Sequence, residues 1–65
     1  MNKLKEIIQE SGYKQNFIAE RLGVHRTEIS QWIADRRRPR NDQIRELSKL
    51  LRCKIKELYP DYKLQ

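Results

Sequence analysis

The sequence has little of what a secreted protein or an enzyme needs. Its single cysteine, Cys53, excludes a disulfide within the chain and favours a reducing compartment. It has one histidine, His25, and neither a glycine-rich phosphate loop nor a cluster of residues at metal-ligand spacing. A chain of this length buries only about 60% of its unfolded surface on folding, which disfavours a deep active site. We therefore expect no enzyme activity, metal, cofactor or small-molecule ligand.

Long apolar runs are also missing. No stretch approaches the roughly 20 apolar residues of a membrane span, and Met1 leads into a charged segment without a signal-peptide core. Positive charge, in contrast, is in excess: 15 Lys and Arg face nine Asp and Glu, which gives a net charge of +6. This excess favours a polyanionic partner, such as nucleic acid or an anionic membrane surface, although solvated basic helix faces produce the same composition. The prediction at this point is a cytosolic binding module.

Apolar residues recur at helical spacing in several short segments. The spacing predicts helices over about 2–11, 15–22 and 25–33, a fourth from about residue 41, and a short fifth around 55–59 that Pro60 ends. Asn2 is expected to cap the first helix. The stretch DRRRPR, residues 35–40, predicts a loop because Pro39 disfavours helix at the residue before it. With no alternating strand pattern, the expected fold class is all-α, with one domain over residues 1–59 and a tail over 60–65.

The second and third predicted helices meet at Gly23 in the manner of a helix-turn-helix. A steep, short turn needs a residue at positive φ, which glycine adopts without a Cβ clash. Ala19 allows close approach of the two helices, and Ile29 fills the angle between them. An ordinary helical corner with a glycine bend is the alternative interpretation. Agreement over the whole apolar skeleton favours the helix-turn-helix; this skeleton comprises Ile18, Ala19, Leu22, Gly23, Val24, Ile29 and Trp32.

The chain also resembles the lambda repressor and Cro-like helix-turn-helix regulators of bacteria and phages, the XRE family. The resemblance spans roughly residues 4–58 and is carried by YKQNFIAERLGV, by HRTEISQW and by IRELSKLLRCKIKEL. Asp35 and Arg52 depart from the pattern, because the family often has glycine at these places, after the third and fourth helices. Ile33 stands where an acidic residue is common, and we expect it to expose an apolar side chain.

The resemblance implies that the third helix enters the major groove of DNA, so that its first turns reach base edges. We expect Arg26 to bond guanine, Gln31 to pair with adenine and the Thr27 methyl to contact thymine. Glu28 is a further candidate, which either accepts from cytosine or only repels the backbone.

Other polar residues are expected to contact the DNA backbone. Gln15 opens the second helix, where a phosphate can meet free backbone N–H groups. His25 either touches a phosphate or caps the third helix. The loop arginines are expected to set most of the salt-dependent affinity, and insertion of one of them into a narrow minor groove is the alternative. We expect at least one of the four to contact nothing. The backbone-contacting candidates are Lys14, Gln15, Asn16, His25, Arg36, Arg37, Arg38 and Arg40.

These features together predict a sequence-specific regulator that binds double-stranded DNA and lies in the cytoplasm at the nucleoid, with no membrane partner. We expect a repressor of the Cro or phage type, because 65 residues leave no separate domain for an inducer or for polymerase recruitment. The alternatives are activation by direct contact, an antitoxin that autoregulates by binding DNA, and the N-terminal domain of a longer repressor. We further expect a weak homodimer, formed only on DNA or also in solution, on a pseudo-palindromic operator. Phe17, Ile33, Tyr62 and Leu64 have no assigned core partners. We expect the dimer to use the C-terminal residues after Pro60, whereas Phe17 faces away from Ile18 and Leu22 and is available to another partner.

Overall fold

A computed structural model describes residues 2–63, and this part of the chain is all-helical. The helices are α1 (Leu4–Ser11), α2 (Gln15–Leu22), α3 (Arg26–Ile33), α4 (Asn41–Leu51) and α5 (Ile55–Leu58). The predicted all-α fold with five short helices is therefore confirmed. Two predicted starts are wrong, because α1 begins at Leu4 and not at residue 2, and α3 begins at Arg26 and not at His25. None of the described helices is long and apolar enough to cross a membrane.

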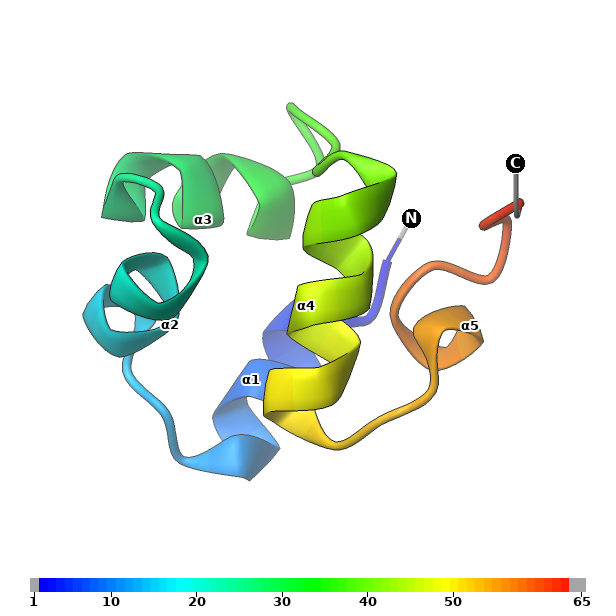
Figure 1. The fold of residues 1–65 in the computed structure, drawn as a ribbon, viewed down its shortest axis with the longest axis horizontal. Coiled ribbons are helices and arrows are strands. Elements are labelled where there is room, and N and C mark those ends of the chain that lie inside the picture. Colours follow the sequence, from blue (N-terminus) through cyan, green and yellow to red (C-terminus); the bar gives the residue numbers. More distant parts are fainter. Residues whose placement is uncertain (1, 64–65) are drawn as a thin grey trace.

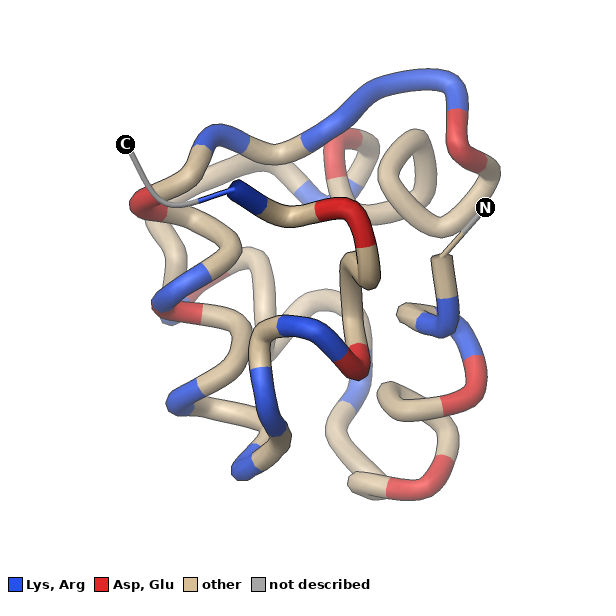
Figure 2. Tube along the Cα trace, turned by 90° about the vertical axis from the view of Figure 1, so that its right-hand side faces the viewer, with Lys and Arg blue, Asp and Glu red and all other residues tan. Residues whose placement is uncertain are grey.

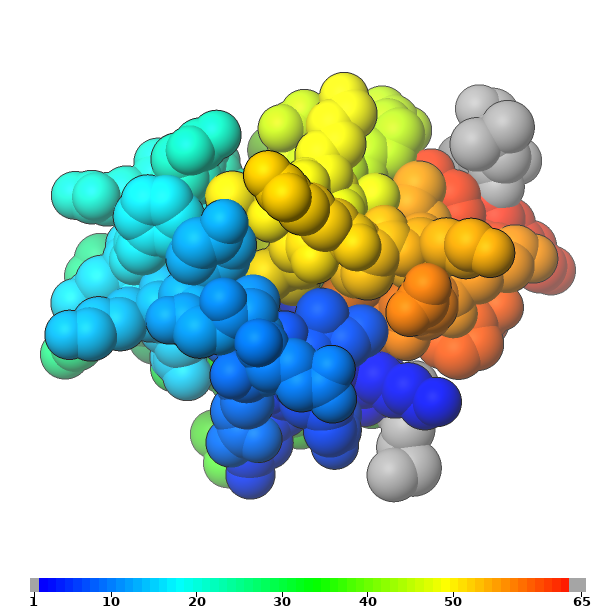
Figure 3. Space-filling model, turned by 90° about the horizontal axis from the view of Figure 1, so that it is seen from below, coloured from blue at the N-terminus to red at the C-terminus, as the bar shows by residue number. Residues whose placement is uncertain are grey.

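The longest helix, α4, stands at the centre of the molecule. Figure 1 shows α1 behind it, α2 and α3 on one side, and α5 on the other side. The loop over residues 35–40 joins α3 to α4, and in Figure 2 it forms the top edge as a mostly blue, basic stretch. Seen from below in Figure 3, the blue residues of α1 lie beside the yellow and orange residues where α4 leads into α5.

One hydrophobic core joins all five helices. The buried residues of α1, α3 and α4 are spaced three or four apart, so that one face of each of these helices is buried. Ile18 and Ala19 of α2 and Leu58 of α5 complete the contribution of the helices. Ile33 is half-buried and packs against this core, so only part of its apolar side chain is exposed. The buried residues are Leu4, Ile8, Ile18, Ala19, Ile29, Trp32, Ile44, Leu47, Leu51, Leu58, Tyr59 and Tyr62.

Asn2 links the start of the chain to the end of α3. Its Oδ1 accepts a hydrogen bond from the N–H of Leu4 at 2.9 Å, so it caps α1 from two residues before the helix. Its Nδ2 donates to the carbonyl of Trp32 at 3.0 Å and to Oδ1 of Asp35 at 3.2 Å. The same side chain therefore satisfies free backbone groups at the start of one helix and at the end of another.

Three helices end in the same hydrogen-bonded motif, in which a left-handed residue follows the last turn. After α2 this residue is Gly23, with φ of 71°, and the next N–H, that of Val24, donates back to the carbonyl of Ala19 at 3.0 Å. After α3 and α4 the left-handed residues are Asp35, with φ of 62°, and Arg52, with φ of 55°. Asp35 and Arg52 therefore adopt the left-handed conformation that glycine adopts after α2, although they are not glycine. This conformation is strained for an L-residue.

Tyr62 belongs to the core and not to a free tail. It is 6% exposed, its N–H donates to the carbonyl of Tyr59 at 2.9 Å, and its hydroxyl accepts from Nη1 of Arg45 at 3.4 Å. The expectation that Tyr62 is free to contact a second copy is therefore wrong. Leu64, the other candidate in this segment, lies outside the described residues.

Replacing Arg52 by glycine is expected to raise the free energy of unfolding by about 0.5–1 kcal/mol. The left-handed conformation costs an L-residue roughly 1–2 kcal/mol, and the greater freedom of glycine in the unfolded chain offsets part of that gain. Asp35→Gly is the matched control, with a smaller gain, because it also removes the acceptor for Asn2. Urea unfolding followed by circular dichroism measures both, and a destabilised Arg52→Gly variant would contradict this account of the turn.

Candidate nucleic-acid interface

An open hollow of about 460 Å³ joins the N-terminal ends of α2 and α3. The side chains that line it are all exposed. They are Lys14, Gln15 and Asn16 from the start of α2, and Arg26, Thr27 and Ser30 from the first turns of α3. All of these except Ser30 were predicted from the sequence to contact DNA, and the structure brings them together in one place.

Ser30 is the residue of this hollow that sequence reasoning missed. Its Oγ donates a hydrogen bond to Oε1 of Gln15 at 3.1 Å, which connects α3 to the start of α2. The helical spacing held a signal for it, because Ser30 lies four residues after Arg26 and therefore on the same face of α3. The bond orients the Gln15 side chain and leaves its amide group as a donor toward the hollow.

The N-terminus of α2 is open to a ligand. The N–H of Ile18 donates to the carbonyl of Lys14 at 3.2 Å, which is the first bond of the helix. The N–H groups of Gln15, Asn16 and Phe17 precede that bond, and no described side chain caps this end. Free N–H groups and the positive end of the helix dipole attract anions such as a phosphate.

The N-terminus of α3 is capped by His25. Its Nδ1 accepts from the backbone N–H of Thr27 at 3.1 Å and lies 2.8 Å from Oγ1 of the same residue. Of the two roles predicted for His25, the structure therefore shows the capping role. A ring nitrogen that accepts from an N–H carries no proton, so the neutral ring holds its proton on Nε2, where it is a donor. The cap also fixes the backbone on either side of Arg26.

The remaining candidates for base contact lie outside this hollow. Glu28 is half-buried and lines a second hollow, which it shares with Arg37, Arg38 and Arg40 of the loop. Gln31 is also half-buried, and its carbonyl accepts from the N–H groups that begin the loop. The structure therefore divides the predicted set: Arg26 and Thr27 border the α2 start, whereas Glu28 faces the basic loop.

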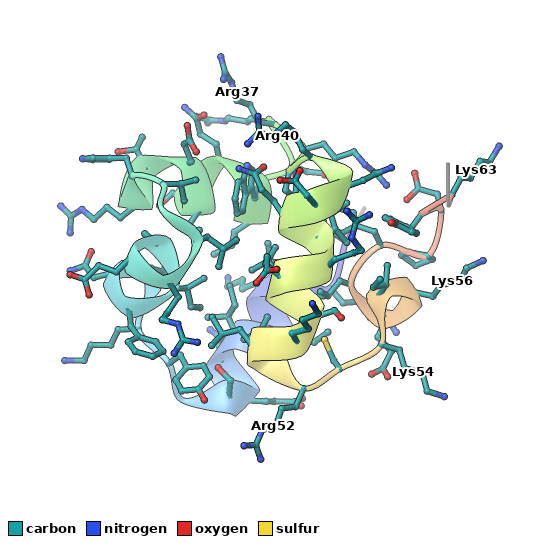
Figure 4. The ribbon with its side chains drawn as sticks, viewed as in Figure 1. Arg37, Arg40, Arg52, Lys54, Lys56 and Lys63 are labelled. Atoms are coloured by element: carbon teal, nitrogen blue, oxygen red, sulfur yellow. The ribbon has the colours of Figure 1, made fainter. Side chains whose placement is uncertain are left out.

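The basic loop carries four exposed arginines in different situations. Figure 4 shows Arg37 pointing away from the molecule above α3 and α4, with Arg40 close to the loop at the start of α4. Nε of Arg40 lies 3.6 Å from Oδ1 of Asp42, and both side chains are well exposed, so this ion pair is weak. Arg36 belongs to the turn that ends α3, because its N–H donates to the carbonyl of Gln31 at 2.9 Å.

Arg38 has partners within the chain. Its Nη1 lies 3.1 and 3.0 Å from the two carboxylate oxygens of Asp61, and its guanidinium sits 4.7 Å from the ring centroid of Tyr59. The hydrogen bond from Arg38 holds the pKa of Asp61 below its ordinary value, and burial raises the pKa of Tyr59 to about 12. The prediction that groups Arg38 with the phosphate-binding arginines overlooked this pairing, which ties the loop to the segment after α5.

Comparison with known protein families matches the chain to a family described as helix-turn-helix, over residues 4–58. A search of curated proteins finds no match to the chain. The matched range contains all five helices and every residue of the hollow between α2 and α3. The chain therefore belongs to the helix-turn-helix family of lambda repressor-like and Cro-like DNA-binding transcriptional regulators.

Proposed function

We propose that the chain is a sequence-specific repressor of the Cro or phage type, which binds a pseudo-palindromic operator as a weak dimer. The observation that supports this proposal is the hollow at the two helix N-termini. There Arg26 and Thr27 lie beside Lys14, Gln15 and Asn16. The residues proposed to read bases, at the start of α3, thus lie next to the residues proposed to bind phosphate, at the start of α2. A helix lying in the major groove requires this arrangement.

In this proposal the start of α3 reads the bases. Arg26 is the first residue of the helix and is exposed, so its guanidinium can bond both O6 and N7 of a guanine. The Thr27 hydroxyl is held near His25, which leaves its methyl group for a thymine. Gln31 and Glu28 lie further along α3 and would contact bases toward the loop side.

The phosphates on either side of the groove would meet two other groups. The open end of α2 supplies free N–H groups together with the side chains of Lys14 and Gln15, and His25 adds its Nε2 donor. On the other side the loop supplies three arginines, Arg36, Arg37 and Arg40. Arg38 holds this loop in place through Asp61, so its part in binding is indirect.

The proposed dimer rests on the small number of base pairs that one chain can read. One recognition helix reads only a few base pairs, and a second copy is needed to discriminate against competing sites in a genome. With Tyr62 in the core, the dimer contact falls to the other residues of the segment after Pro60. Repression then requires only that the bound dimer occupies the operator.

Arg26→Ala is expected to weaken binding to the preferred sequence by about 1–3 kcal/mol and to relax the preference at one or two base pairs. The reason is the loss of a bidentate base contact. Competition binding with single-base variants of the preferred site measures both effects. Equal losses on preferred and random DNA would contradict a base-reading role for Arg26.

Arg37→Ala is expected to weaken binding to all sequences and to lower the slope of log K against log salt by about 1, because one phosphate contact is lost. Lys56→Ala is the matched control, since it removes one charge from α5, away from the loop (Figure 4). Arg38→Ala is expected to change the slope less than Arg37→Ala does. Equal slopes for the Arg37 and Lys56 variants would exclude the loop as a phosphate-binding element.

Selection of bound duplexes from a random pool tests the proposed function as a whole. The expected motif has two inverted half-sites with centres about 34 Å apart, which is one turn of DNA. Sedimentation at saturating DNA is expected to give two chains for each duplex. An asymmetric motif bound by one chain would contradict the dimer, and selection of no motif would contradict sequence-specific binding.

A further inference from the structure

An exposed aromatic pair lies on the side of α2 away from the DNA hollow. Tyr13 and Phe17 are each 38% exposed, the large hydrophobic residues that the described part of the chain leaves in solvent. Their ring centroids are 5.0 Å apart, and the guanidinium of Arg21 lies 5.8 Å from the Phe17 centroid. Phe17 and Arg21 lie four residues apart on one face of α2, and Tyr13, which precedes the helix, continues this stripe through its ring contact with Phe17.

A groove of about 360 Å³ lies beside this stripe, between α2 and the end of α4. Its apolar residues, Leu22 and Leu50, are half-buried and accessible from the groove. Figure 3 shows this face, where the yellow end of α4 lies beside the light-blue residues that join α1 to α2. We name it the α2–α4 groove, and it is lined by Tyr13, Arg21, Leu22, Glu46, Lys49, Leu50 and Arg52.

The charge around the groove is mainly positive. Arg21, Lys49 and Arg52 face a single acidic residue, Glu46, whose Oε1 lies 4.0 Å from Nζ of Lys49. A second copy that docked through the same groove would bring these cations against each other, and both copies carry a net charge of +6. Repulsion between like charges opposes such a contact, whereas an acidic partner would be attracted to these cations.

The groove and the DNA hollow are separate surfaces. They share no lining residue, although both use α2. Phe17 follows Gln15 by two positions, so the two side chains point about 200° apart around the helix axis. A partner in the groove therefore leaves the proposed DNA contacts uncovered.

We propose that the α2–α4 groove docks an acidic amphipathic segment of a partner protein. Aliphatic side chains of that segment would pack against Tyr13, Leu22 and Leu50, with Phe17 at the edge. Its carboxylates would pair with Arg21 and with the cations at the end of α4. Apolar anchors give affinity at such a surface, and the charged rim sets the choice of partner. This interaction is additional to the proposed DNA binding and does not depend on it.

The test uses a synthetic peptide of about twelve residues, roughly three helical turns, with two leucines four positions apart among glutamates and alanines. The matched peptide carries lysine in place of each glutamate. Both are titrated at up to millimolar concentration into the isotope-labelled full chain, and amide chemical shifts are recorded without DNA. The acidic peptide is expected to shift the amides of Tyr13, Leu22 and Leu50, and the basic peptide is expected to shift none of them.

Variants separate the apolar contribution from the charge contribution. Tyr13→Ala is expected to weaken the acidic peptide about ten-fold, because it removes an aromatic anchor. Arg21→Gln is expected to weaken it about two- to five-fold, whereas the charge-matched Lys56→Gln is expected to have no effect. Equal binding of both peptides, or no shifts in the groove, would overturn the proposal. Shifts in these residues that depend on protein concentration alone would also overturn it, because the occupant would then be a second copy.

Discussion

The crossing of α2 and α3 is the constraint on which the proposed DNA interface depends. Ile18 and Ile29 are completely buried where the two helices pack, and Ala19 is small enough to let them approach. The left-handed Gly23 turns the chain between them and is fixed by the bond from Val24 to Ala19. Because of this turn, the N-terminal ends of both helices open into one hollow, although Gln15 and Ser30 are fifteen residues apart.

Charge alone would not have located this interface. Figure 4 shows basic side chains at opposite edges of the molecule, with Arg37 and Arg40 above the helices and Arg52 and Lys54 below and to the side. What distinguishes the α2–α3 side is the combination of charge with helix ends. Free N–H groups at the start of α2 and the Arg26 side chain at the start of α3 add directional donors to the general attraction for a polyanion.

The parts of the fold that follow from local patterns were predictable from the sequence. Helical periodicity located the five helices, and the glycine at the bend located the turn, so most of the hollow was predicted residue by residue. Contacts between distant side chains were not predictable in this way. Asn2 reaches Trp32, and Arg38 reaches Asp61 across 23 positions, and neither pairing leaves a periodic signal in the sequence. The buried position of Tyr62 was missed for the same reason, because a single aromatic residue after a proline has no helical repeat to reveal its face.

The most direct test of the central claim is an amide chemical-shift titration of the full chain with its selected duplex. If the two helix N-termini form the interface, the largest shifts fall on residues 14–16 and 26–30, with smaller shifts in the loop over 35–40. Residues 52–57, which carry Arg52, Lys54 and Lys56, are then expected to change little. If the largest shifts fell on residues 52–57 instead, DNA would be bound by charge at the opposite edge, and the account given for the α2–α3 hollow would be wrong.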